Sequence, residues 1–173
     1  MPLGLAISRR GRANHFLAVL LAALAIISSA SLVAPCFVWN LSPSLPRGLY
    51  LLDMPAAPHR GAIVSFRPPP DAAALIERRS YLPAGVALIK IVVAVPGDSV
   101  RVDESDVRIN GQLLGPVAPA DSAGRVLAPF LFDGRVPAGQ AFVATSAALS
   151  FDSRYFGFVP LSALTVVEPI WTY

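Results

Sequence analysis

Two serines and one lysine are the residues of this chain whose types and positions indicate chemistry. Ser42 and Ser44 stand among prolines and a glycine in the stretch NLSPSLPRGLY, residues 40–50. A serine acts as a nucleophile only when a base accepts its proton. The chain has thirteen arginines but a single lysine, Lys90, in the middle of the apolar run ALIKIVVAV. An ammonium group in apolar surroundings loses solvation, so its pKa falls and the neutral amine can act as a base, whereas arginine stays protonated.

Two other interpretations compete with a serine–lysine pair. The chain has two histidines, His15 and His59, and only His59, in the turn APHRG, is placed to complete a serine–histidine–aspartate triad. Lys90 could instead be an ordinary strand lysine whose head reaches solvent, and a genome that prefers arginine codons would explain why the lysine is single. The position of Lys90 alone therefore leaves the identity of the base open.

A long apolar run precedes the serines. Residues 16–39 contain no ionisable side chain except one thiol, and at about 1.5 Å per residue they are long enough to cross a hydrocarbon core of about 30 Å as a helix. Three arginines and no acid precede this run, whereas residues 40–173 contain eleven basic and eleven acidic side chains. Because positive charge is retained in the cytoplasm, we predict a cytoplasmic basic tail, 1–15, a transmembrane anchor, 16–39, and an exported domain, 40–173.

The charge distribution also bears on other assignments. The sequence pI of about 9.5 arises from the tail, so it is a topology signal and not a basic patch on the folded domain; no nucleic-acid partner is expected. A cleavable signal peptide is the alternative to an anchor, since the start is basic and SSAS offers small residues. The apolar run, however, is longer than the usual signal-peptide core of about 7–15 residues.

The exported domain is predicted to be mainly β, because short runs rich in β-branched and aromatic residues alternate with proline, glycine and aspartate. We expect strands at residues 48–53, 61–66, 87–95, 99–102, 107–115 with a hairpin turn at Asn110-Gly111, 140–145 and 164–171. One helix is expected at residues 71–79, capped by Asp71. The chain shows no glycine-rich phosphate loop and no metal-spaced histidine or cysteine set, so we expect neither a cofactor nor a metal.

Three stretches together resemble a known family. SPSLPRGLY, residues 42–50, resembles the nucleophile box of the type I signal peptidases, which are membrane-anchored Ser/Lys peptidases of the S26 family. LIKIVVAVPGD, residues 88–98, is similar to their lysine box, and SFDSRYFGFVP, residues 150–160, is similar to the box that closes their catalytic core. The short length, the single anchor, PRGLY and the terminal EPIWTY are most similar to the conjugative-transfer signal peptidases of the TraF type.

The resemblance implies a role for each matching residue. Ser44 matches the nucleophile and Lys90 the general base. The hydroxyl of Ser42 and the backbone N–H of Ser44 match the two donors of the oxyanion hole. The fold implied is a signal-peptidase-like antiparallel β domain, and the pockets implied accept small apolar residues in the pattern Ala-x-Ala.

The last box implies supporting residues, and the sequence departs from the family near two of the boxes. Ser150 matches a serine that orients the lysine amine, and Asp152 and Arg154 match a structural ion pair. Ile91 stands where the family often has arginine after the lysine. Residues 144–146, Ala-Thr-Ser, replace an expected Gly-Asp-Asn, which leaves open any aspartate-mediated support of the last box.

The resemblance thus implies a serine endopeptidase of the bacterial inner membrane, with its catalytic domain in the periplasm. Its partners would be the lipid bilayer and a signal-bearing precursor, most specifically a pilin precursor for conjugative transfer; the product could be linear or cyclic. A general leader peptidase is the alternative. A catalytically silent membrane-anchored scaffold of a pilus or secretion complex is an alternative of another class, and the distance between Ser44 and Lys90 in the folded chain separates it from the enzyme.

Overall fold

The computed structural model describes residues 17–24 and 36–173. Residues 17–24 form a helix. Among the residues described, no helix combines the length and the apolar character needed to cross a membrane. The predicted tail, 1–15, and half of the predicted anchor, residues 16 and 25–35, lie outside the described residues.

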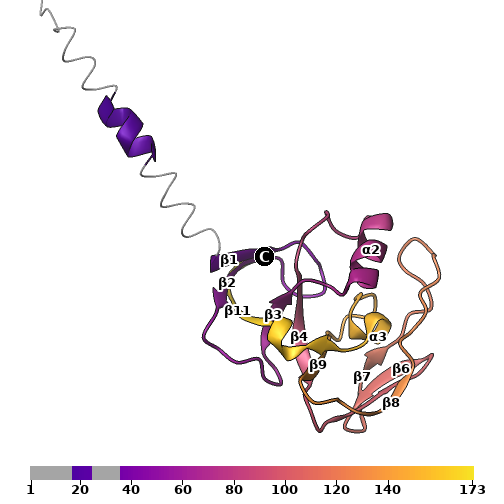
Figure 1. The fold of residues 1–173 in the computed structure, drawn as a ribbon. Helices are drawn as coiled ribbons and strands as arrows, with labels where there is room; N and C mark the ends of the chain where they lie inside the picture. The colour runs from indigo at the N-terminus through magenta and orange to yellow at the C-terminus, as the bar shows by residue number, and fades with distance from the viewer. Residues whose placement is uncertain (1–16, 25–35) are drawn as a thin grey trace, which may run out of the picture. The chain divides into compact units, whose positions relative to one another are not determined.

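Contacts divide the chain into two units, Met1–Phe37 and Val38–Tyr173. From Phe37 onward the chain consists mainly of short strands (Figure 1). The strands are β1 Phe37–Asn40, β2 Gly48–Asp53, β3 Ile63–Phe66, β4 Leu88–Ala94, β5 Ser99–Val102, β6 Asp106–Ile109, β7 Gln112–Pro116, β8 Phe132–Arg135, β9 Gln140–Ala144, β10 Val159–Pro160 and β11 Thr165–Thr172. The helical elements are α2 Pro70–Arg78, α3 Ser153–Phe156 and the 3-10 turn η2 Leu161–Ala163.

The strands form two sheets. The larger has seven strands in the order β1-β2-β11-β3-β4-β9-β10, and the smaller has four in the order β7-β6-β5-β8. The pairs β2–β11, β3–β11, β3–β4, β4–β9, β9–β10, β5–β6, β5–β8 and β6–β7 are all antiparallel. The prediction of a mainly β, antiparallel domain is therefore confirmed.

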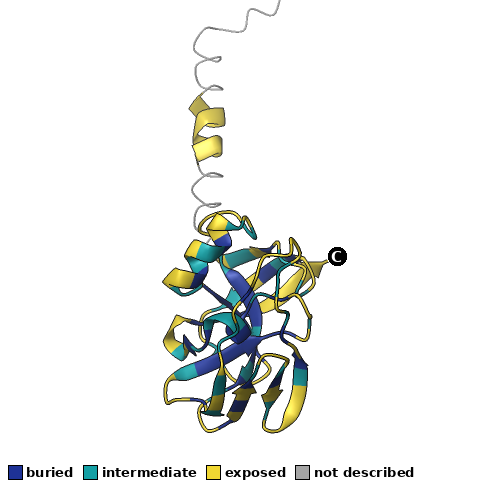
Figure 2. Ribbon diagram, turned by 90° about the vertical axis from the view of Figure 1, so that its right-hand side faces the viewer, coloured by how far each residue is buried: buried dark blue, intermediate teal, exposed yellow. Residues whose placement is uncertain are grey.

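The strands alternate in burial because successive side chains point to opposite faces of a sheet. Buried residues, dark blue in Figure 2, gather along the central strands. On β4, Leu88 and Val92 face the largest core cluster together with Val64 of β3, whereas Ile89 faces a smaller cluster around Tyr50. Lys90 shares the face of Leu88 and Val92, so this strand carries its one charge into the core.

Several elements differ from the prediction. Residues 37–39, assigned to the anchor, lie in strand β1 and not in a helix. Helix α2 starts one residue early, at Pro70, and Asp71 is not its cap. The physical reason is that proline lacks the N–H that the first helical position leaves unpaired; Asp71 lies in the first turn, where its charge still complements the helix dipole.

Candidate active site

Strand β4 buries the single lysine. Lys90 is 2% exposed, and its Cα lies opposite that of Val64 in the neighbouring strand β3. Burial lowers the pKa of the Lys90 ammonium from 10.5 to about 8; the negative charge of Asp152 raises it, and the positive charge of Arg154 lowers it. A minority of molecules, about one in ten, therefore carries a neutral amine at about pH 7.

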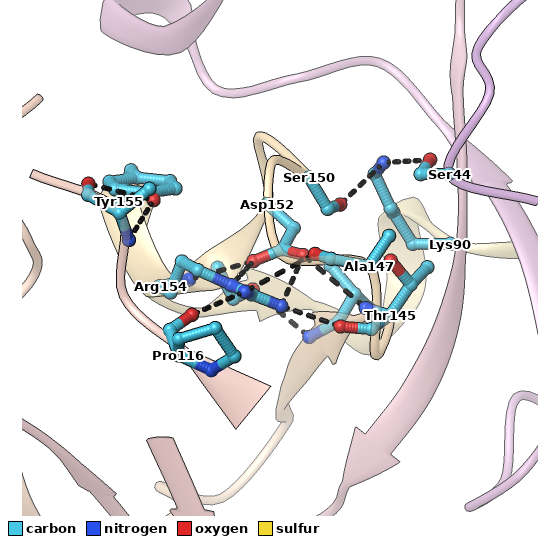
Figure 3. A network of polar contacts seen from close by, with 12 residues as sticks. Ser44, Lys90, Pro116, Thr145, Ala147, Ser150, Asp152, Arg154 and Tyr155 are labelled. Carbon is cyan, nitrogen blue, oxygen red and sulfur yellow. Dashed lines mark hydrogen bonds and ion pairs between the residues drawn. The ribbon is translucent and has the colours of Figure 1, made fainter. Parts of the chain in front are cut away.

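The loop between β1 and β2 brings the two serines to this lysine (Figure 3 shows Ser44 beside Lys90). Lys90 Nζ donates to Ser44 Oγ at 2.6 Å. Ser42 Oγ lies 2.8 Å from Ser44 Oγ, and the two hydroxyls share a hydrogen bond. Ser42 Oγ also accepts from the backbone N–H of Ser44 at 3.3 Å. Both groups matched to the oxyanion hole are thus adjacent to the nucleophile.

Ser150 completes the surroundings of the amine. Its hydroxyl, in a residue that is 3% exposed, accepts a hydrogen bond from Lys90 Nζ at 3.0 Å. The Lys90 amine thus lies between two hydroxyls, Ser44 and Ser150 (Figure 3). Two contacts from different loops restrict the amine to one direction, towards the nucleophile.

A buried ion pair holds the loop that carries Ser150. Asp152 and Arg154 are both fully buried, and Arg154 Nε donates to Asp152 Oδ1 at 2.8 Å. Arg154 also donates to the carbonyls of Pro116 and Thr145, at 2.7 and 2.5 Å. The guanidinium therefore joins the end of β7, the end of β9 and the turn before α3, which is a structural role.

The two departures from the family pattern have local explanations. Thr145 supports the last box through its main chain, because its N–H donates to Asp152 and its carbonyl accepts from Arg154. Because this link runs through the main chain, it does not require an aspartate side chain. The Thr145 hydroxyl is buried and has no hydrogen-bond partner among the described residues. Ile91 lies on the opposite face of β4 from Lys90 and pairs with β3 and β9, so its side chain points away from the amine.

Ser44 and Lys90 lie on the lining of a cavity of about 430 Å³. Its lining includes a charged cluster in which Asp121 Oδ2 accepts from Tyr81 Oη at 2.6 Å, Arg125 Nε at 2.8 Å and Arg79 Nη1 at 3.1 Å. The Tyr81 ring contacts the Phe151 ring at a centroid distance of 5.6 Å. The cluster therefore joins the end of α2 to the loop before β8, on the lining of the cavity.

The alternative base does not lie at this cavity. His59 is exposed, its Nδ1 lies 3.1 Å from the Ala57 carbonyl, and it is not among the residues that line the cavity. His15 lies outside the described residues. Within residues 17–24 and 36–173, no group of three or more His, Cys, Asp or Glu is arranged to hold a metal ion.

Next to the nucleophile, Asn40 has no counterpart in the sequence-based predictions. Asn40, the last residue of β1, is 3% exposed and accepts from the N–H of Ser42 at 3.0 Å. An asparagine two residues before the N–H that it binds is typical of an Asx turn, so NLS was the available signal. Its other two hydrogen bonds, to backbone carbonyls in the same loop, require the folded loop to be recognised.

A buried lysine in contact with a serine, beside a cavity of an antiparallel β domain, is an arrangement that suits a peptidase, and sequence comparison supports this class. The chain belongs to the signal peptidase family: the family model described as signal peptidase, peptidase S26, matches residues 12–171.

Individual relatives are more specific. The conjugal transfer protein TraF of Agrobacterium fabrum is 37% identical over 145 residues, which cover 78% of this chain and 81% of that protein. The probable conjugal transfer protein TraF of Sinorhizobium fredii is 34% identical over 190 aligned positions, covering 100% of this chain and 98% of that protein. The probable signal peptidase I-2 of Synechocystis sp. is 35% identical over 112 residues, covering 62% of this chain and 44% of that protein.

Proposed function

We propose that this protein is a membrane-anchored serine endopeptidase that removes signal or leader segments from exported precursors, with Ser44 as nucleophile and Lys90 as general base. The observation that carries the proposal is the 2.6 Å contact between Ser44 Oγ and a buried Lys90 Nζ at the edge of a cavity. Membership of the signal peptidase family supports it. The same contact counts against a silent scaffold, which would not need a buried, partly neutral amine beside a serine.

The first step is attack on the scissile carbonyl. Neutral Lys90 keeps one N–H on Ser150 and accepts the Ser44 hydroxyl proton with its lone pair. Ser44 Oγ forms a bond to the carbonyl carbon, and the carbonyl oxygen becomes an oxyanion. The Ser44 N–H and the Ser42 hydroxyl now donate to this oxyanion. Each such donor can lower the barrier by roughly 3–4 kcal/mol.

The Ser44 N–H and the Ser42 hydroxyl must give up their present hydrogen bonds before they can donate to the oxyanion. In the free protein the Ser44 N–H points to Ser42 Oγ at 3.3 Å, a long and weak hydrogen bond. A developing negative charge is a stronger acceptor than a hydroxyl oxygen, so both donors turn to the oxyanion as it forms. The exchange stabilises the transition state more than the free enzyme, which is the requirement for catalysis.

The second half of the reaction returns the protons. Protonated Lys90 donates to the leaving amine as the C–N bond breaks, which leaves an ester on Ser44. Neutral Lys90 then takes a proton from water, the hydroxide adds to the ester, and the acid product leaves as Ser44 regains its proton. If an amine replaced this water, the product would be a new peptide bond or a cyclic chain.

The relatives support a conjugative substrate. The two conjugal transfer proteins match at least 78% of this chain and at least 81% of their own lengths, whereas the probable signal peptidase I-2 is matched over only 44% of its length. We therefore favour a precursor of the conjugative apparatus, such as a pilin, over the general set of exported proteins. A general leader peptidase remains the second candidate.

A location at the outer face of the inner membrane is part of the proposal. The predicted anchor ends next to the nucleophile loop, and the unit Val38–Tyr173 has an aromatic edge of exposed residues: Trp39, Trp171 and Tyr173. The ring centroids of Trp39 and Trp171 are 5.9 Å apart, and those of Trp171 and Tyr173 are 5.2 Å apart. Trp and Tyr are enriched where proteins meet lipid headgroups, so this edge supports work at the bilayer surface.

Processing of precursors by the full-length protein in detergent tests the proposal. Pilin precursors and a general secretory precursor are incubated with the protein, and the products are sized by mass spectrometry. Ser44→Ala and Lys90→Arg should each abolish cleavage, and the double variant should be no worse, because each partner depends on the other. Ser122→Ala is the matched control, since it changes an exposed serine of the same cavity. Cleavage by Lys90→Arg would exclude the mechanism, because a guanidinium cannot serve as the base.

A further inference from the structure

Asn40 closes the nucleophile loop, residues 41–47, on itself. Its Oδ1 accepts from the N–H of Ser42 at 3.0 Å, and its Nδ2 donates to the carbonyls of Leu45 and Pro46 at 3.1 and 3.0 Å. These bonds lie on both sides of Ser44, one before it and two after it. One buried side chain therefore ties together the two flanks of the nucleophile.

The three partners require a carboxamide of this length. A backbone N–H can only donate and a backbone carbonyl can only accept, so the side chain must offer one acceptor and two donors. Aspartate offers acceptors alone, and glutamine is one methylene longer. The same partners also fix which end of the Asn40 amide is oxygen.

We propose that Asn40 is a positioning residue of the peptidase, which holds Ser42 and Ser44 in their reactive directions before substrate binds. The inference rests on the proposed function of the dyad. Among the described residues, the Asn40 side chain makes its hydrogen bonds to the nucleophile loop and none to Lys90, so it acts on the reaction through the loop.

The rest of the loop explains why such a clamp matters. Pro43 and Pro46 restrict the backbone but have no N–H to anchor it. The far end of the loop is held elsewhere: Tyr50 Oη donates to the Pro46 carbonyl at 2.7 Å, and the Arg47 carbonyl accepts from the N–H of Tyr173 at 2.9 Å. Asn40 is the group that connects this fixed end to the segment containing Ser42.

At Gly48, directly after the nucleophile loop, the backbone of β2 lies very close to that of β11. Gly48 has φ +144°, and a Cβ there would lie 1.9 Å from the carbonyl oxygen of Trp171. Only glycine allows β11 to come this close to β2. The end of the loop is therefore held close to β11, and Asn40 links the segment containing Ser42 to this end.

Steady-state kinetics of the full-length protein with a fluorogenic peptide that contains an Ala-x-Ala site tests the inference. Asn40→Ala removes all three bonds, and we expect kcat to fall on the order of a hundredfold, because a displacement of about 1 Å can cost that much. KM should change by less than about threefold, since the cavity walls are intact. The pH midpoint of kcat/KM should not move, because Lys90 keeps its surroundings. Asn40→Ser can still accept from the Ser42 N–H, and its kcat should fall between those of Asn40→Ala and wild type.

The matched control is Asn110→Gly. Asn110 Oδ1 accepts from the N–H of Ser99 at 2.9 Å and its Nδ2 donates to Asp98 at 3.1 Å, so a comparable set of bonds is lost in a hairpin turn outside the cavity. Glycine suits the φ of 51° at this position. We expect a lower melting temperature and an unchanged kcat. This result separates positioning of the nucleophile from a general loss of stability.

The kinetics of the Asn40 variants can overturn the positioning role of Asn40. A folded Asn40→Ala with kcat within about twofold of wild type, or with KM raised in place of a kcat loss, would overturn the inference. If Asn40→Ala does not fold, Asn40→Ser is judged by the same two criteria. An inactive wild-type protein would overturn the proposed function and this inference with it, whereas an active wild type with a fully active Asn40→Ala would overturn the inference alone.

Discussion

The pH dependence of cleavage follows from the burial of Lys90. Its pKa is lowered from 10.5 to about 8, and the base acts only when it is neutral. At pH 7 about one molecule in ten is then competent, compared with about one in three thousand for an unshifted lysine. Burial thus raises the competent fraction roughly three-hundredfold. Because deprotonation activates the enzyme, kcat/KM should rise with pH through a single ionisation near 8 and level off above it.

The measurement is kcat/KM of the full-length protein for an Ala-x-Ala peptide from about pH 6 to about pH 10. Ser42→Ala should lower the plateau by on the order of a hundredfold, since one oxyanion donor is lost. It should leave the midpoint in place, because Ser42 contacts the nucleophile and not the amine. A lower plateau with an unchanged midpoint in Ser42→Ala would show that Ser42 serves the oxyanion and not the base.

Two results would refute the reasoning. A midpoint near about 6.5 that disappears in His59→Ala would assign the base to histidine and remove Lys90 from the chemistry. A midpoint close to the ordinary lysine value would mean that the amine is solvated during catalysis, contrary to its 2% exposure in the free protein.

Two further predictions concern stability and membrane contact. Asp152→Asn leaves the fully buried Arg154 without its counter-charge and should lower the free energy of unfolding by about 3–5 kcal/mol in urea titrations; Asp133→Asn, at an exposed aspartate, is the control, and a loss similar to that control would contradict the structural role of the pair. Trp39→Phe leaves Trp171 as the single tryptophan, and its fluorescence should be quenched when the full-length protein is in vesicles of brominated lipids. Emission equal to that in unbrominated vesicles would count against the aromatic edge as a membrane contact.

The strand pattern was predictable because it depends on local alternation. The expected runs at residues 48–53 and 99–102 coincide with β2 and β5, and Asn110-Gly111 forms the turn between β6 and β7. Lys90 stood out by the same criterion, as the one charge in an apolar run. The structure brings it to Ser44 and Ser150, and their catalytic roles stay predictions.

The missed features depend on distant partners. Strand β8, sequence FDGR, has no apolar alternation of its own and forms because β5 offers it an edge. The charged cluster on the lining of the cavity joins Arg79 to Asp121, which is 42 residues further along the chain. No short-range pattern in the sequence indicates such a contact, because each partner alone is typical of a solvated surface.

The buried ion pair resolves a conflict between holding the loop of Ser150 and keeping Lys90 partly neutral. The Asp152 carboxylate accepts from the Thr145 N–H, but a lone negative charge there would favour the lysine ammonium and raise its pKa. Arg154 has the opposite effect on the pKa of Lys90, and burial has a larger effect than either charge. With their fields opposed, desolvation decides the protonation of the amine. The pair can therefore anchor three backbone segments beside the base without abolishing its basic form, which a single buried aspartate would not allow.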